Sequence, residues 1–201
     1  FVGAGGKGWH AIKSLANNGM VNMVAFADVD QAHASAAYKA HPDVPRFQDF
    51  RVMLDKLGKE IDGVIISTPD HTHHYIARWC LKAGKPVYLE KPLTHNIAEA
   101  RDLMALEQET GLACQMGNQG HSCGGILMLD AWVRAGALGT VQDVHAWCVP
   151  NWSFADARPA TEPVPETLAW DQWLGAAAQV PYSSKYCPGR WRGWHAFGGC
   201  A

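Results

Sequence analysis

The chain has 201 residues, of which 48% are hydrophobic and 18% charged, which is typical of a globular protein with one domain and part of a second. Its net charge of −2 at pH 7 gives no electrostatic reason to expect nucleic acid or an anionic membrane as a partner. No window approaches about 18 uncharged apolar residues, and the six cysteines have neither the spacing of a zinc site nor that of a small disulfide-rich domain.

A glycine-rich motif opens the chain. Gly3, Gly5 and Gly8 have the spacing G-x-G-x-x-G, and they stand between an apolar pair and a predicted helix over residues 9–18. In this arrangement the first glycine permits a tight turn, the second lets a diphosphate approach the backbone, and the third lets helix and strand pack closely. We therefore expect Gly3, Gly5, Gly6 and Gly8 to bind the phosphates of a dinucleotide at the N-terminus of that helix.

An acidic residue follows the second predicted strand, residues 21–27. Asp28 stands where a carboxylate accepts hydrogen bonds from the adenosine ribose hydroxyls and repels a 2′-phosphate. No basic residue follows until Lys39, so the sequence favours NAD over NADP as the cofactor. Asp28 could instead cap a helix, but Asp30 fits that role better.

Strand and helix patterns alternate through the first 120 residues. Further strands are predicted over residues 64–67, 87–90 and 112–116, and further helices over residues 31–40, 50–57, 72–82 and 97–109. Such alternation is typical of a doubly wound α/β fold, in which a parallel sheet has helices on both faces. We expect this dinucleotide-binding domain to span residues 1–120.

Ligands of such sheets bind outside the carboxyl ends of the strands. Besides the glycine turn and Asp28, the candidates at those ends are Ser67, Thr68, Pro69, His71, Glu90 and Lys91. Lys91 would lie beside the expected nicotinamide, where an amine can hydrogen-bond a substrate hydroxyl and assist proton transfer. It could equally be an exposed lysine in a proline-containing turn.

Polar and aromatic residues form a second group of candidates. Asn118, Gln119 and His121 follow the last strand, and their side chains suit sugar hydroxyls, although they could equally cap the loop. Trp191 and Arg192 could form a wall that stacks on a saccharide, or belong to a packing cluster.

The pattern changes beyond residue 120. A helix is predicted over residues 125–135 and one long strand over residues 141–149, followed by a loop-rich, proline-rich stretch. A single strand cannot bury a face by itself, so we expect residues 121–201 to be the start of an incomplete second domain. The sequence begins without Met and ends in a glycine-rich run, and we expect it to be a fragment truncated at both ends.

Four features together, in this order and spacing, resemble the Gfo/Idh/MocA oxidoreductase family: the glycine motif, Asp28, residues 67–71 (STPDH) and residues 88–92 (YLEKP). The likeness is greatest to a branch that also carries GNQGHS, here residues 117–122, and WRGW, here residues 191–194. The resemblance implies an α/β protein with an NAD(P)-binding Rossmann domain, built on a parallel sheet, followed by an α/β domain with an open, mostly antiparallel sheet.

The resemblance also implies an activity. Family members oxidise or reduce sugars, inositols and related polyols with NAD(P), and a few use NAD transiently to cleave glycosides. The family's catalytic lysine falls on Lys91, and the peptide before Pro92 is often cis in relatives. The usual acid/base pair, an Asp and a His four residues apart, would lie beyond Ala201, so the fragment alone is expected to be inactive.

Several hypotheses therefore stay open. The first is an NAD-dependent dehydrogenase that transfers hydride to or from a carbinol carbon of a sugar, polyol or glycoside. The others are an NAD-dependent glycosidase and a non-catalytic dinucleotide sensor. No metal is expected, although residues 70–74 (DHTHH) are rich in histidine. We expect a homo-oligomer when the protein is full length, in the cytoplasm or, by twin-arginine export, in the periplasm.

Overall fold

The computed structural model describes residues 1–147 and 158–198 and contains one parallel sheet. Its strands are β1 (Phe26–Ala27), β2 (Arg46–Phe47), β3 (Val64–Ile66), β4 (Val87–Glu90) and β5 (Cys114–Gly117). β1 pairs with β2, and β3, β4 and β5 pair in that order. Val2 bridges both Ala27 and Ile66, so the order across the sheet is β2, β1, Val2, β3, β4, β5.

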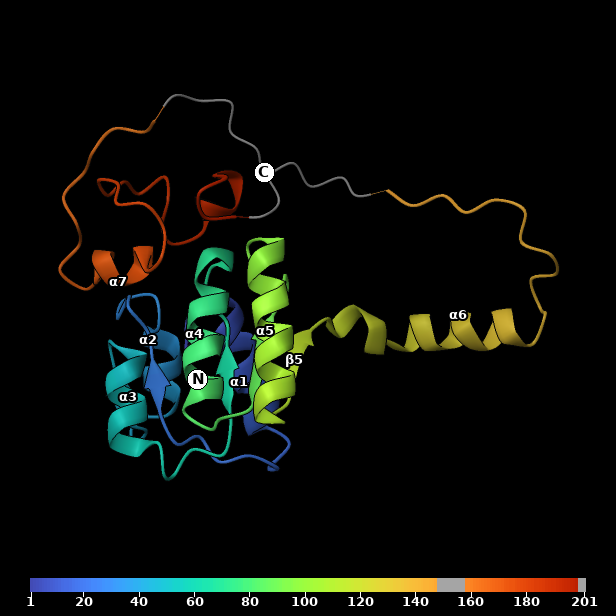
Figure 1. Cartoon of the computed structure of the whole chain (residues 1–201), viewed down its shortest axis with the longest axis horizontal. Helices are drawn as coiled ribbons and strands as arrows, with labels where there is room; N and C mark the ends of the chain where they lie inside the picture. The colour runs from blue at the N-terminus through green and yellow to red at the C-terminus, as the bar shows by residue number, and fades with distance from the viewer. Residues whose placement is uncertain (148–157, 199–201) are drawn as a thin grey trace.

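Five helices cover this sheet. They are α1 (Gly6–Ala16), α2 (Ser35–Ala40), α3 (Phe50–Leu57), α4 (Asp70–Lys82) and α5 (Ile97–Thr110). Phe26 packs with residues of α1 and α2, whereas its neighbour Ala27 belongs to a core that includes residues of α3, α4 and α5. Because successive strand residues point to opposite faces, these clusters lie on the two sides of the sheet. The doubly wound α/β prediction is confirmed, and Figure 1 shows α4 and α5 side by side across it.

Local signals explain where several of these helices begin and end. The Asp49 carboxylate accepts a hydrogen bond from the Arg51 amide at the start of α3, and the Asn96 side chain accepts one from the Glu99 amide at the start of α5. Gly111 ends α5 with a φ of 67°, a conformation that favours glycine. These caps match the predicted boundaries of α3 and α5 to within one residue.

Two predicted elements of the first domain are shorter than expected by several residues. Within residues 21–27 only β1 forms a strand, because only Phe26 and Ala27 lie opposite residues of β2. The helix predicted over residues 31–40 begins at Ser35, because residues 31–34 form a turn in which the Ser35 amide donates to the carbonyl oxygen of Ala32, at 3.2 Å. β2 has no counterpart among the predicted strands.

The chain beyond β5 differs from the prediction more strongly. A 3₁₀ turn, η1 (Gln119–Ser122), leads into α6 (Gly124–Arg134), which buries none of its residues and extends away from the sheet in Figure 1. The predicted strand over residues 141–149 is wrong for residues 141–147, which have no regular structure and are exposed; residues 148 and 149 lie outside the described ranges. A strand needs a paired neighbour, and none faces this stretch within residues 1–147 and 158–198.

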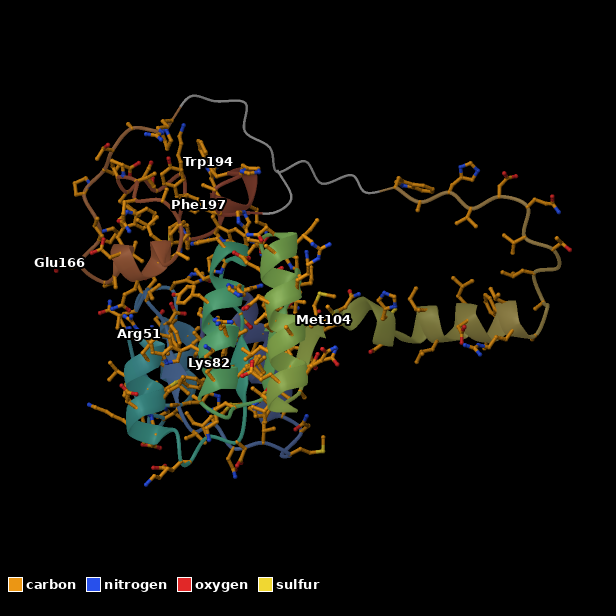
Figure 2. The ribbon with its side chains drawn as sticks, viewed as in Figure 1. Arg51, Lys82, Met104, Glu166, Trp194 and Phe197 are labelled. Atoms are coloured by element: carbon orange, nitrogen blue, oxygen red, sulfur yellow. The ribbon has the colours of Figure 1, made fainter. Side chains whose placement is uncertain are left out.

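An aromatic cluster organises the last segment, residues 158–198. Its buried members come from α7 (Trp170–Leu174), from the 3₁₀ turn η2 (Arg190–Gly193) and from the loops around them; they are Leu168, Trp170, Trp173, Leu174, Tyr182, Tyr186, Cys187, Trp191 and Phe197. Figure 2 shows Trp194 and Phe197 among the side chains of this segment. No strand longer than a single bridge occurs in it, so the antiparallel sheet expected for the second domain is not seen in the described part of the chain.

The aromatic segment is attached to the sheet domain through backbone contacts. Leu168 forms an antiparallel bridge with Asp30, and the Ala169 amide donates to the carbonyl oxygen of Val29 at 2.9 Å. Both contacts lie just beyond the carboxyl end of β1.

In the parts of the chain that the structure describes, no helix combines the length and apolar character needed to cross a bilayer.

Candidate functional site

A cavity of about 440 Å³ lies at the carboxyl ends of the strands, between the sheet domain and the aromatic segment. Its size falls in the range of small-molecule sites, about 300–1,000 Å³. Of the residues predicted from the sequence to bind ligands, those that line it are Gly3, Gly5, Gly6, Asp28, Ser67, Thr68, Pro69, Glu90, Lys91, Gln119, Trp191 and Arg192. The fold therefore brings together candidates from six separate stretches of sequence.

The glycine turn forms one side of this cavity. Gly3 has a φ of 82°, and a Cβ there would lie 2.6 Å from the carbonyl oxygen of Ser67. A Cβ on Gly8 would overlap the carbonyl oxygen of Gly3, so only glycine permits the close packing of α1 on the strand. α1 begins at Gly6, and the amides of a helix's first turn have no acceptor within the helix. This geometry suits an anionic group.

Asp28 ties the end of β1 to that turn. One carboxylate oxygen, Oδ2, accepts hydrogen bonds from the amides of Ala4 and Gly5 at 2.8 and 3.0 Å, and Oδ1 accepts one from the Asp30 amide at 2.9 Å. Burial raises the pKa of the Asp28 carboxyl, and these three amides oppose that rise. A carboxylate offers about four acceptor positions, so the three amides leave one open for a ligand hydroxyl, and Asp28 lines the cavity.

Ser67 offers a second polar group to a ligand. Its hydroxyl is buried, lines the cavity and has no hydrogen-bond partner among the described residues. A buried hydroxyl without a partner is costly, and a bound polar molecule would satisfy it. The glycine turn, the open position on Asp28 and this hydroxyl together fit a dinucleotide.

Lys91 and Glu90 stand at the end of β4. The Glu90 carboxylate, only 7% exposed, accepts a hydrogen bond from Gln119 Nε2 at 2.6 Å and lies 3.6 Å from the Nζ of Lys7. Lys91 is exposed and lines the cavity beside it, and the peptide between Lys91 and Pro92 is cis, as the family resemblance implies. The amine is therefore accessible at the mouth of the cavity.

Three of the predicted ligand-binding side chains lie elsewhere. His71 is buried, with Nε2 2.9 Å from the carbonyl oxygen of Trp173 and Nδ1 3.3 Å from that of Phe197, and it does not line the cavity. Burial lowers the pKa of His71 to about 4, against the opposing effect of the two carbonyls. Asn118 and His121 are exposed and do not line the cavity, although Gln119 between them does.

Sequence reasoning missed several lining residues. The imidazole of His33 lies against Gly5 and Gly6, so close that a Cβ on Gly5 would overlap it. Trp173 and Cys187 form part of the opposite wall, and burial raises the pKa of the Cys187 thiol to about 12. His33 carried no motif signal, but the density of tryptophans after residue 147 could have indicated an aromatic wall.

The histidines of residues 70–74 serve separate contacts. The rings of His71 and His73 bind backbone carbonyls, and His74 Nε2 lies 2.8 Å from the Asp102 carboxylate. Within residues 1–147 and 158–198, no cluster of three or more His, Cys, Asp or Glu side chains could hold a metal ion.

Comparison with known proteins identifies relatives of this chain. A family model described as an oxidoreductase family with an NAD-binding Rossmann fold, Gfo/Idh/MocA, matches residues 1–118. Inositol 2-dehydrogenase 1 of Saccharopolyspora erythraea is 34% identical over 112 residues, which are 55% of this chain and 33% of that protein. A glycosyl hydrolase family 109 protein of Shewanella amazonensis is 31% identical over 122 residues, 57% of this chain and 27% of that protein.

A solved structure shares the fold. The WlbA dehydrogenase of Thermus thermophilus, in complex with NAD and UDP-GlcNAcA, superposes with a TM-score of 0.59 at 24% identity, over 67% of this chain and 45% of that one. The chain thus spans less than half the length of each of these relatives. The family model covers more than half of the chain, and the glycine turn, Asp28 and Lys91 all line one cavity. The chain therefore belongs to the Gfo/Idh/MocA oxidoreductase family, with its NAD-binding Rossmann fold.

Proposed function

We propose that the protein is an NAD-dependent dehydrogenase that transfers a hydride to or from a carbinol carbon of a sugar or polyol. The observation that carries the proposal is the meeting of the glycine turn, Asp28 and Lys91 around one cavity. The similarity to an inositol 2-dehydrogenase supports the substrate class.

Each group has a part in this reaction. The amides at the start of α1 would bind the diphosphate, and the open acceptor position of Asp28 would bind a ribose hydroxyl. Bound NAD supplies the hydride acceptor. Lys91 Nζ, accessible at the cavity mouth, would donate a hydrogen bond to the oxygen of the substrate's carbinol group and so orient that carbon toward the nicotinamide.

The sequence predicts that Gln119 binds a substrate hydroxyl, and its contacts add a second role, that of holding Glu90. Its amide nitrogen binds the Glu90 carboxylate at 2.6 Å and lies 3.1 Å from the Tyr88 hydroxyl. We propose that it fixes Glu90 beside Lys91 and still presents its amide oxygen to a substrate hydroxyl. Trp191, 5% exposed with the Arg192 guanidinium 4.2 Å above its ring, would present its edge rather than its face to a sugar.

Protein expressed from the complete reading frame tests the proposal. We expect calorimetry to detect NAD binding, and absorbance at the nicotinamide band to rise with at least one member of a panel of inositols, hexoses and sugar acids. Binding without turnover of any member would favour a non-catalytic sensor. An absence of binding to both NAD and NADH would contradict the proposal as a whole.

A glycosidase that oxidises its substrate only transiently is the second candidate. The similarity to a glycosyl hydrolase family 109 protein favours it, at an identity close to that of the dehydrogenase. Such an enzyme needs no pair of catalytic carboxylates at the scissile bond. Release of p-nitrophenol from nitrophenyl glycosides with bound NAD and no net NADH would identify it.

The assembly and location of the whole protein follow from the family resemblance alone. We propose a homo-oligomer that acts on a small carbohydrate or polyol. For its location we propose the cytoplasm, with twin-arginine export to the periplasm as the alternative. Light scattering of the complete protein and fractionation of cells that express it test both points.

A further inference from the structure

His73 lies beneath the two loops that flank the cavity and has no role in the function proposed above. It belongs to the first turn of α4, and none of its surface is exposed. Its Nδ1 lies 2.7 Å from the carbonyl oxygen of Pro92, and its Nε2 lies 2.9 Å from the carbonyl oxygen of Thr68. One imidazole therefore connects backbone segments that are 24 residues apart in the sequence, since the two partners are 19 and 5 residues from it.

These contacts lie just beyond the last paired residues of β3 and β4. The ladder between β3 and β4 ends at the pair Ile66 and Leu89. Thr68 and Pro92 lie beyond that pair, on loops that no strand pairing connects. The His73 ring takes over as the cross-link between the loops at the carboxyl edge of the sheet.

The cross-link bears on Lys91. On one side Lys91 follows Glu90, the last residue of β4, whose carboxylate is held by Gln119. On the other side it precedes Pro92, whose carbonyl is held by His73. The backbone of Lys91 is therefore held on both sides, by the contact of Glu90 with Gln119 and by that of Pro92 with His73, while its amine is exposed.

We propose that His73 is a positioning residue for Lys91, which sets the height of the lysine at the cavity mouth by contacting the carbonyls of Thr68 and Pro92, of which a neutral imidazole, with its single N–H, hydrogen-bonds one. The inference rests on the proposed function for its effect on turnover, although its effect on Lys91 itself does not depend on that function. A reacting group displaced by about 1 Å can cost about 100-fold in rate, so a second residue that holds the backbone has a measurable consequence.

Two substitutions separate the two contacts of the His73 ring. His73→Asn places an amide nitrogen near the position of Nδ1, toward Pro92, and His73→Gln places one near Nε2, toward Thr68. His73→Phe keeps a ring and removes both ring nitrogens. His74→Phe is the matched control, because His74 is the adjacent residue and contacts Asp102 instead of the carbonyls of Thr68 and Pro92.

The variants are made in the complete protein, with myo-inositol and NAD as the probes. We expect His73→Phe to lower kcat by about 10–100-fold while the KM and Kd for NAD stay within about 2-fold. His73→Asn restores most of kcat because Pro92 adjoins Lys91, whereas His73→Gln behaves like His73→Phe. Equal effects of the Asn and Gln variants, or a fall in kcat that tracks lost NAD affinity and a lower Tm, would overturn the proposal.

A chemical measurement keeps the inference separate from the proposed function. Competitive labelling with acetic anhydride reports the accessibility of each lysine, and Lys82, exposed at the other end of α4, serves as the internal reference. We expect Lys91 to be labelled faster relative to Lys82 in His73→Phe and His73→Gln, and at the wild-type ratio in His73→Asn and His74→Phe. Unchanged ratios in all variants would overturn the positioning role even if NAD is bound and turned over. If the wild type neither binds NAD nor turns over myo-inositol, the changed ratios would still support it.

Discussion

Helix α5 is packed against the sheet and helix α6 is exposed, although their compositions would predict the reverse. α5 is rich in charged residues, yet Leu103 and Leu106 are 1% and 3% exposed against the sheet. α6 is almost entirely apolar after its two glycines, yet Leu129 and Trp132 are 45% and 47% exposed. An apolar face indicates that a helix can bury surface, but a neighbouring element decides whether it does. The packed region, residues 1–119, ends with Gln119, which binds Glu90, and the chain from Gly120 to residue 147 lies outside it.

The largest loss of unfolding free energy is expected at Gly8, where α1 packs most closely on the backbone of Gly3. A Cβ on Gly8 would overlap the carbonyl oxygen of Gly3, which cannot move without displacing the strand. We expect Gly8→Ala to lower the free energy of unfolding by about 3 kcal/mol or more and to abolish NAD binding. Urea denaturation and calorimetry measure both effects.

The same substitution outside the packed region provides the control. A Cβ on Gly120 would meet no heavy atom within 4 Å, and Gly120 is not among the glycines with positive φ. We expect Gly120→Ala to change stability by less than about 0.5 kcal/mol. Similar losses for the two variants would mean that the contact between Gly3 and Gly8 does not limit the packing of α1.

A pair of leucines compares the two helices directly. Leu103→Ala in α5 removes a side chain that is 1% exposed, so we expect a loss of about 2–5 kcal/mol in unfolding free energy. Leu129→Ala in α6 removes one that is 45% exposed, so we expect a change below about 0.5 kcal/mol. Chemical denaturation of both variants gives the comparison, and a large loss for Leu129→Ala would show that α6 is packed in solution.

The sequence could predict the packed region because its signals are local. The glycine motif, the Asp49 cap and the apolar pattern at residues 64–66 each depend on residues close in the chain, and the structure agrees with them. The failures involve partners far away in the sequence. His71 is predicted to bind a ligand at a strand end, but its ring is buried against the carbonyls of Trp173 and Phe197, 102 and 126 residues away, one of which a neutral imidazole can hydrogen-bond.

His71 also provides a test of how the aromatic segment is held on the packed region. Burial lowers the pKa of His71 to about 4, below the ordinary value of 6.5. The folded protein thus favours the neutral ring, and the stability associated with it is present above pH 6.5 and is lost as the pH falls toward about 4. At 1.36 kcal/mol per pH unit, the loss approaches about 3 kcal/mol.

The measurement compares the wild type with His71→Gln. Urea unfolding followed by tryptophan fluorescence between pH 7 and pH 4.5 gives the stability of each, since carboxylates that titrate in the same range affect both proteins alike. We expect the wild type to lose more stability than the variant over this range. Parallel curves would indicate that the ring is not buried between Trp173 and Phe197 in solution.

The smallest change in free energy is expected for NAD binding, when Asp28 in the cavity is replaced. The open acceptor position of its carboxylate is lost in Asp28→Asn, and a hydrogen bond to a charged group contributes about 1.5–3 kcal/mol. We therefore expect the variant to bind NAD about 10–100-fold more weakly by calorimetry. Burial raises the pKa of the Asp28 carboxyl, so the wild type should lose NAD affinity on acidification at a pH above the ordinary carboxyl value of 3.8, as the ionised acceptor becomes protonated.

A variant in the unpacked region sharpens this last comparison. Trp132→Gln in α6 changes an exposed residue that does not line the cavity, so its NAD affinity and pH dependence should match the wild type. Asp28→Asn, by contrast, should show a flatter response to pH because it has no carboxylate to protonate. If Trp132→Gln weakened NAD binding as much as Asp28→Asn, α6 would have to reach the coenzyme in solution, and the boundary between packed and exposed regions would not hold for the bound protein.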